Sequence, residues 1–130
     1  MKIDFDKTMH KLQFQATKLL GDRTRLSKLT KKAMDMVTEK HQFSEIKEDV
    51  LLSLHLIWDW SRGNYKGVSK KSLLMIAGSI LYLLNPFDLI PDFILGIGFL
   101  DDVTIFLSLI HRISDELNKY RHWRQGYYYE

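Results

Sequence analysis

Both prolines of this chain fall within one short stretch, residues 82–102, and this constrains the fold more than any other feature of the sequence. A proline inside a helix removes a backbone hydrogen bond and clashes with the preceding turn. The rest of the chain is therefore free to be helical. Apolar residues recur at three- and four-residue steps on both sides of the stretch, which is the period of a helix with one buried face. The sequence predicts an all-α fold.

The N-terminal half predicts three amphipathic helices. The first ends at Gly21, a residue type that favours the position just past a helix end. Either Asp22 or Thr24 could cap the second helix, because short polar side chains accept a hydrogen bond from the free backbone N–H groups there. Ser44 is the candidate cap of the third helix, whose apolar stripe includes Trp58.

The second helix carries a basic face opposite its apolar stripe. Its cations are Arg25, Lys28, Lys31 and Lys32. Residues 1–71 hold fifteen Lys and Arg against nine Asp and Glu, whereas the rest of the chain holds four against seven. The basic face is either an ordinary solvated surface or a site for an anionic membrane surface. Nucleic acid is the least favoured partner, because no aromatic residue lies among these cations in the sequence.

Residues 72–87 form an uncharged run of sixteen, which is shorter than the roughly 20 apolar residues of a membrane-spanning helix. All-round apolarity at this length predicts a buried central helix. It should form a hairpin with a last long helix over residues 101–120. A hairpin that dips into one leaflet of a membrane is the alternative.

Four aspartates lie in the connection of that hairpin: Asp88, Asp92, Asp101 and Asp102. Asp88 and Asp92 each follow a proline closely, at positions where new helices should begin. Asp101 is the expected N-cap of the last long helix and Asp102 lies in its first turn, so each aspartate has a helix start to serve. There a carboxylate can accept hydrogen bonds from backbone N–H groups and interact favourably with the helix dipole. The alternative is an oxygen-ligand site for Mg²⁺ or Ca²⁺, although the regular spacing of a calcium loop is missing.

Other signals of metal or catalytic chemistry are sparse. His55 with Asp59, and His111 with Asp115, are pairs four residues apart that could hold a metal if two helices faced each other. The chain has no cysteine, which excludes disulfides and thiolate ligands. No P-loop, nucleophile elbow or dinucleotide fingerprint is present. We therefore expect no cofactor, with a divalent cation at the aspartates as the alternative.

One extended motif remains, and its residues are Tyr82, Pro86, Asp88, Leu89, Ile90, Pro91, Asp92, Phe93, Ile94, Gly98, Asp101 and Asp102. In this pattern the chain resembles the YkvA-like family, the domain of unknown function 1232. The family often has proline where this chain has Leu95. The resemblance implies a small bacterial helical protein, often described as membrane-associated, and it supplies no catalytic residues.

These observations predict a single compact domain of about five helices, with basic amphipathic helices in residues 1–65 and the hairpin in residues 70–120. We expect a non-enzymatic module that binds a membrane surface or a protein partner. The alternative is a metal-dependent enzyme that uses the four aspartates. The charged start of the chain does not resemble a signal peptide, so we expect a cytoplasmic protein, peripheral at the inner membrane face. Bases and aromatics mix from Arg121 onward, as at lipid–water interfaces; the alternative is a frayed terminus or a tail packed against its own bundle.

Overall fold

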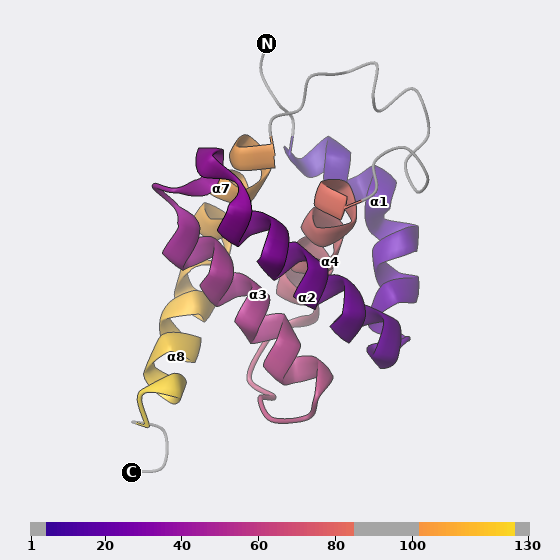
Figure 1. Ribbon diagram of the computed structural model, residues 1–130. Coiled ribbons are helices and arrows are strands. Elements are labelled where there is room, and N and C mark those ends of the chain that lie inside the picture. Colours follow the sequence, from indigo (N-terminus) through magenta and orange to yellow (C-terminus); the bar gives the residue numbers. More distant parts are fainter. Residues whose placement is uncertain (1–4, 85–101, 127–130) are drawn as a thin grey trace.

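The computed structural model describes residues 5–84 and 102–126, apart from the side chains of Phe5, Thr8 and Asp102 (Figure 1). The described elements are α1 (Phe5–Leu20), α2 (Arg23–Glu39), the short 3₁₀ helix η1 (His41–Phe43), α3 (Lys47–Ser61), α4 (Lys70–Leu84), α7 (Asp102–Arg112) and α8 (Ser114–Arg124). The described residues contain no strand, which confirms the all-α prediction. They contain six α-helices, whereas about five were predicted for the whole chain.

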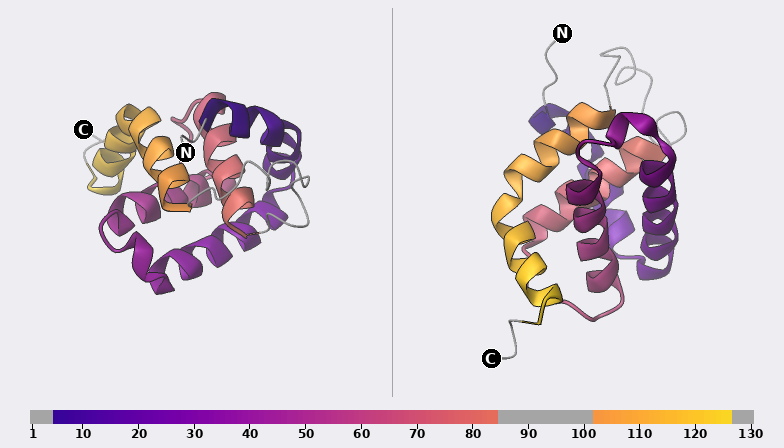
Figure 2. Two further views of the ribbon diagram at one scale, coloured as in Figure 1. Left: turned by 90° about the horizontal axis from the view of Figure 1, so that it is seen from above. Right: turned by 60° about the vertical axis from the view of Figure 1, so that its left-hand side comes forward.

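Helix α4 lies at the centre of the fold, as its uncharged sequence predicts. It packs against α1, α2, α3 and α7. Figure 2 shows α4 between α1 and α7, with α2 and α3 across a third side. Its buried residues include small ones, Gly78 and Ser79, and at Gly78 an added Cβ would lie 2.8 Å from the Met9 sulfur of α1. The glycine therefore allows α1 to approach α4 closely.

Helix α2 begins where its sequence predicts. The Asp22 side chain accepts a hydrogen bond from the Arg25 backbone N–H at 3.1 Å, which makes Asp22 the N-cap. The face opposite the cations is buried through Leu26, Ala33 and Val37. This burial fixes which side of α2 faces solvent.

The predicted cap of α3 is wrong. Ser44 lies at the end of η1, and α3 begins at Lys47 after Ile46, whose side chain makes no capping hydrogen bond. The reason is that Phe43 is completely buried and makes an edge-on contact with Phe106. Packing of this ring places a 3₁₀ turn where local sequence alone favoured a helix start.

The long helix predicted over residues 101–120 is in fact two helices. Ile113, with φ −108° and ψ 20°, separates α7 from α8 and is itself buried. Asp115 and Glu116 then lie in the first turn of α8, where the helix dipole favours carboxylates. The break lets α7 contact α4 while α8 runs along α3.

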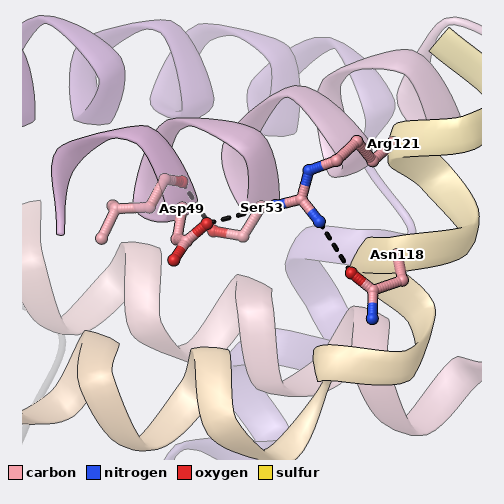
Figure 3. Close-up of polar contacts among 5 residues, drawn as sticks. Asp49, Ser53, Asn118 and Arg121 are labelled. Atoms are coloured by element: carbon pink, nitrogen blue, oxygen red, sulfur yellow. Dashed lines mark hydrogen bonds and ion pairs between the residues drawn. The ribbon is translucent and has the colours of Figure 1, made fainter. Parts of the chain in front are cut away.

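Polar contacts hold α8 against α3. Figure 3 shows the Arg121 guanidinium between the Asp49 carboxylate, at 3.2 Å, and the Asn118 side-chain oxygen, at 2.7 Å. In the same half of α8, the rings of Tyr120 and Trp123 each lie 5.0 Å from the ring of Tyr65, which comes from the α3–α4 loop. The contacts of α8 with Asp49 and with Tyr65 join residues far apart in the chain, so they could not be predicted from local sequence.

Candidate anion-binding groove

A groove of about 500 Å³ runs between the first half of α2 and the end of α3. We call it the basic groove, and its lining residues are Arg23, Thr24, Ser27, Lys28, Lys31, Trp58, Ser61 and Arg62. Four of these side chains are cationic, and the lining residues that the structure describes include no carboxylate. An uncompensated cluster of cations in a concavity attracts anions, because low-dielectric walls focus the field of the charges.

The α2 wall of the groove follows from the helical repeat. Arg23, Ser27 and Lys31 lie four residues apart, and Thr24 and Lys28 repeat that spacing beside them. Residues at this spacing share one side of a helix. Because the other side of α2 is buried against the core, this row faces solvent next to α3.

The two walls meet at a pair of serines. The Ser27 and Ser61 hydroxyl oxygens are 3.0 Å apart, and the Ser61 hydroxyl donates to the Trp58 carbonyl oxygen at 2.7 Å. Since Ser61 uses its proton on that carbonyl, Ser27 is the donor to Ser61. Both hydroxyl protons are thus used within the protein, so neither serine has a hydroxyl proton left to donate to a bound anion.

Two tryptophan rings orient the arginines of this region. The Arg62 guanidinium lies over the Trp58 ring at 5.1 Å from its centroid. The Arg23 guanidinium lies over the Trp60 ring at 4.2 Å and also donates to the Trp60 carbonyl oxygen at 3.3 Å. Such cation–π contacts reduce the freedom of the side chain without neutralising its charge. The arginines are therefore partly preorganised as anion ligands.

A glycine positions Arg62 at the mouth of the groove. Arg62 is the C-cap of α3, and Gly63 directly after it has φ +81°, in the left-handed region. Glycine adopts this conformation without a steric penalty and commonly ends helices in this way. The turn stops α3 beside the start of α2.

The predicted cations of α2 are only partly grouped by the structure. Lys28 and Lys31 line the basic groove, whereas Lys32 is exposed on α2 outside it and Arg25 is half-buried. Sequence reasoning missed Arg23 and Arg62, because one lies at the first residue of a helix and the other belongs to the next loop. Trp58 and Trp60 were the available signal for these two arginines, since arginine stacks readily on indole.

Trp58 also corrects two sequence arguments. It was assigned to the apolar stripe of α3, but it is only partly buried and lines the basic groove. Nucleic acid was ranked last because no aromatic lies among the basic residues in the sequence. In the folded chain an indole does lie beside Lys28 and Lys31, so that reason no longer holds.

The two histidine–aspartate pairs do not form a metal site. His55 Nδ1 lies 2.8 Å from the Leu51 carbonyl oxygen, which can only accept, so this nitrogen carries the proton. Asp59 accepts a hydrogen bond from the Tyr120 hydroxyl. His111 and Asp115 lie on different helices, on either side of the break at residue 113. Among residues 5–84 and 102–126 no group of three or more potential ligands is placed to hold a metal ion.

A partly buried polar cluster that the sequence did not reveal joins α8 to the start of α4. The Glu116 carboxylate accepts hydrogen bonds from the Ser69 backbone N–H at 2.8 Å, the Ser69 hydroxyl at 2.7 Å and the Ser72 hydroxyl. Burial by itself would raise the pKa of Glu116, but the hydrogen bonds from Ser72 and Ser69 and the Lys119 charge lower it below its usual value. This carboxylate serves as a cap for α4 supplied from α8.

Comparison with known proteins identifies the segment around α4. Residues 72–107 match the family described as a protein of unknown function (DUF1232). The chain is also 41% identical, over 69 residues, to a Bacillus subtilis (strain 168) protein named "Uncharacterized membrane protein YkvA". Over this segment the chain is therefore similar to the YkvA-like DUF1232 family. The aligned region is 53% of this chain and 65% of the relative, so the chain spans less than two thirds of that protein. No solved structure matches the chain significantly.

The DUF1232 segment covers α4 from its third residue and the first half of α7, whereas the basic groove lies outside it, between residues 23 and 62. Of the family motif, Tyr82 is buried in α4 and Asp102 is the first residue of α7. The remaining motif residues named for a site lie outside the described residues: Pro86, Asp88, Pro91, Asp92, Gly98 and Asp101. The predicted roles of the aspartates, as caps or metal ligands, therefore stay predictions. Within the described ranges, every helix is too short or too polar to cross a membrane.

Proposed function

We propose that this chain is a non-enzymatic helical module that binds an anionic membrane surface through the basic groove and the neighbouring cations of α2. The observation that supports the proposal is the gathering of Arg23, Lys28, Lys31 and Arg62 around one concavity without a carboxylate among its described lining residues. In this proposal residues 1–130 act as one domain, at the cytoplasmic face of the membrane. The name of the Bacillus subtilis relative, a membrane protein, is consistent with such a setting.

The energetics of such binding are modest for each residue and substantial together. A lysine or arginine near an anionic bilayer contributes on the order of 1 kcal/mol, and the effect falls off within a Debye length. The four cations of the groove, with Lys32 and Arg25 beside them, can thus supply roughly 6 kcal/mol without any apolar insertion, which corresponds to a dissociation constant on the order of tens of micromolar. Trp58 adds an indole, a side chain that favours the lipid–water interface.

The other predicted functions make different demands. A metal-dependent enzyme requires Asp88, Asp92, Asp101 and Asp102 to converge, and their side chains lie outside the described structure. A protein partner would have to present an acidic surface to the same groove. The membrane surface is preferred because the groove offers charge and an interfacial aromatic together.

Vesicle sedimentation tests the proposal. The protein should bind vesicles that contain phosphatidylglycerol, should not bind neutral phosphatidylcholine vesicles, and should dissociate as salt rises. Replacing Arg25, Lys28, Lys31 and Lys32 together by Gln should abolish binding.

The matched control is a second fourfold Gln variant with the same change in net charge. It replaces exposed lysines of the α3–α4 loop, α4 and α8: Lys66, Lys70, Lys71 and Lys119. This variant should retain most of the binding. Equal loss of vesicle binding in both variants would mean that only the net charge of the protein matters. Binding of the unmutated protein to nucleic acid but not to vesicles would refute the membrane proposal.

A further inference from the structure

The basic groove differs from the rest of the basic face because its charges come from two elements. Arg23, Lys28 and Lys31 belong to α2, and Arg62 faces them from the end of α3. Lys32, one residue after Lys31, is also exposed but does not line the groove. Successive helical residues are about 100° apart around the axis, which explains this separation of two adjacent lysines.

The ligating groups suit a phosphate group better than a carboxylate or a diffuse surface. A guanidinium presents a planar row of N–H donors that matches phosphate oxygens, and lysine adds a mobile point charge. Arg62 and Arg23 are held over Trp58 and Trp60, so less side-chain freedom is lost when they bind. A volume of about 500 Å³ falls within the usual range for small-ligand sites and is enough for a phosphate with its glycerol.

Charge favours a phosphomonoester over a phosphodiester. A monoester near neutral pH carries roughly −1.5 to −2 charges, because its second pKa is about 6, whereas a diester carries one. The groove has four cations and no carboxylate among its described lining residues, and both serine hydroxyl protons are used internally. Discrimination in such a site depends on ligand charge.

We infer that the basic groove is a site for one phosphomonoester group, and that the ligand at the membrane is a lipid with a phosphomonoester headgroup, of the phosphatidate type. This inference rests on the proposed function, since it specifies which lipid the same surface binds. It adds the requirement that one phosphomonoester group binds at one site on each protein molecule. Diffuse attraction to a charged surface does not require such a site.

The experiment compares Lys31→Gln with Lys32→Gln. Both side chains are exposed on α2, so both variants should fold, which circular dichroism checks, and both lose the same charge. Binding is measured on phosphatidate vesicles and on phosphatidylglycerol vesicles adjusted to equal surface potential. In parallel, thermal melts record the effect of glycerol 3-phosphate against sodium chloride at equal ionic strength.

If the inference is correct, the unmutated protein prefers phosphatidate vesicles at equal surface potential. Lys31→Gln then weakens phosphatidate binding about threefold or more beyond Lys32→Gln, while the two variants behave alike on phosphatidylglycerol. A second outcome is possible: glycerol 3-phosphate raises the melting temperature, Lys31→Gln alone abolishes this rise, and the protein shows no preference for phosphatidate vesicles. That outcome supports the phosphate site and assigns a soluble phosphomonoester as its ligand.

Equal behaviour of the two variants on both lipids, with no effect of glycerol 3-phosphate, overturns the inference. In that case salt-sensitive binding to all anionic vesicles would still support the proposed function. Failure to bind any vesicle would refute the proposed function as well, so the two failures are distinguishable.

Discussion

The Tyr120 hydroxyl donates a hydrogen bond to the Asp59 carboxylate, joining α8 to α3 across 61 residues of sequence. Tyr120 is completely buried, and its ring packs on Tyr65 and Trp123. The same end of α3 carries Trp58, Trp60 and Ser61, which form or support one wall of the basic groove. The contact therefore holds the position of α8 relative to the groove-bearing helix.

Removing this hydroxyl should destabilise the protein. Tyr120→Phe keeps the ring but leaves the half-buried Asp59 carboxylate without that donor, which should cost about 1–3 kcal/mol of unfolding free energy. Chemical denaturation measures the change. Tyr65→Phe is the control, since it removes the hydroxyl of another buried tyrosine but not this donor. Equal losses in the two variants would contradict a specific role for the Tyr120–Asp59 bond.

Stability should fall at alkaline pH. Burial raises the pKa of Tyr120, and so do the hydrogen bond to Asp59 and its charge; burial and Glu116 raise the pKa of Tyr65. A raised folded-state pKa means that the stabilisation is complete below the unfolded value of about 10 and is lost as pH rises above it. The loss should reach at most about 1.4 kcal/mol per pH unit for each tyrosine.

Denaturant titrations at a series of pH values above about 9 measure this slope. Tyr120→Phe should make the slope shallower, because the variant lacks one of the two groups that must stay protonated. A slope unchanged by the substitution would show that other groups cause the alkaline loss.

The Glu116 cluster predicts a loss of stability in acid. Its pKa is lowered, so its stabilisation is complete above the ordinary value near 4.5 and is lost as pH falls through the folded-state pKa. Glu116→Gln should cost about 1–2 kcal/mol at neutral pH and should flatten the acid limb of the stability profile. Asp115→Asn, next to it and exposed, is the control; it loses only the interaction with the helix dipole and should have a clearly smaller effect on both.

One core position should tolerate, and even favour, loss of a hydroxyl. Thr30 on α2 is completely buried, and its Oγ1 has no hydrogen-bond partner among the described residues. Thr30→Val replaces the hydroxyl by a methyl group of similar shape and should raise the unfolding free energy by about 1–2 kcal/mol. Thr30→Ala, which also leaves a cavity, should gain less or lose stability. A destabilised Val variant would indicate that the hydroxyl has a partner after all.

Much of the helical framework could be predicted from the sequence, because it depends on interactions within a few residues. Periodicity located α1 and α2, Asp22 was a correct candidate cap, and the uncharged run before Pro86 predicted a central α4. The YkvA-like motif was also visible, since it is a linear pattern that a family profile matches directly. Lys28 and Lys31 were found because helical spacing alone places them on an exposed side.

The remainder depended on contacts between residues far apart in the chain. The break at Ile113 lets α7 and α8 pack on different helices, and the burial of Phe43 moves the start of α3 away from Ser44. Arg62 and Trp58 join the cations of α2 because α2 packs against α3, where the Ser27 and Ser61 hydroxyls meet. The sequence by itself determined which segments are helical and which faces are apolar or basic. Tertiary packing decided where helices break and which charges share a groove, because free energies of burial and of long-range hydrogen bonds exceed local helix preferences.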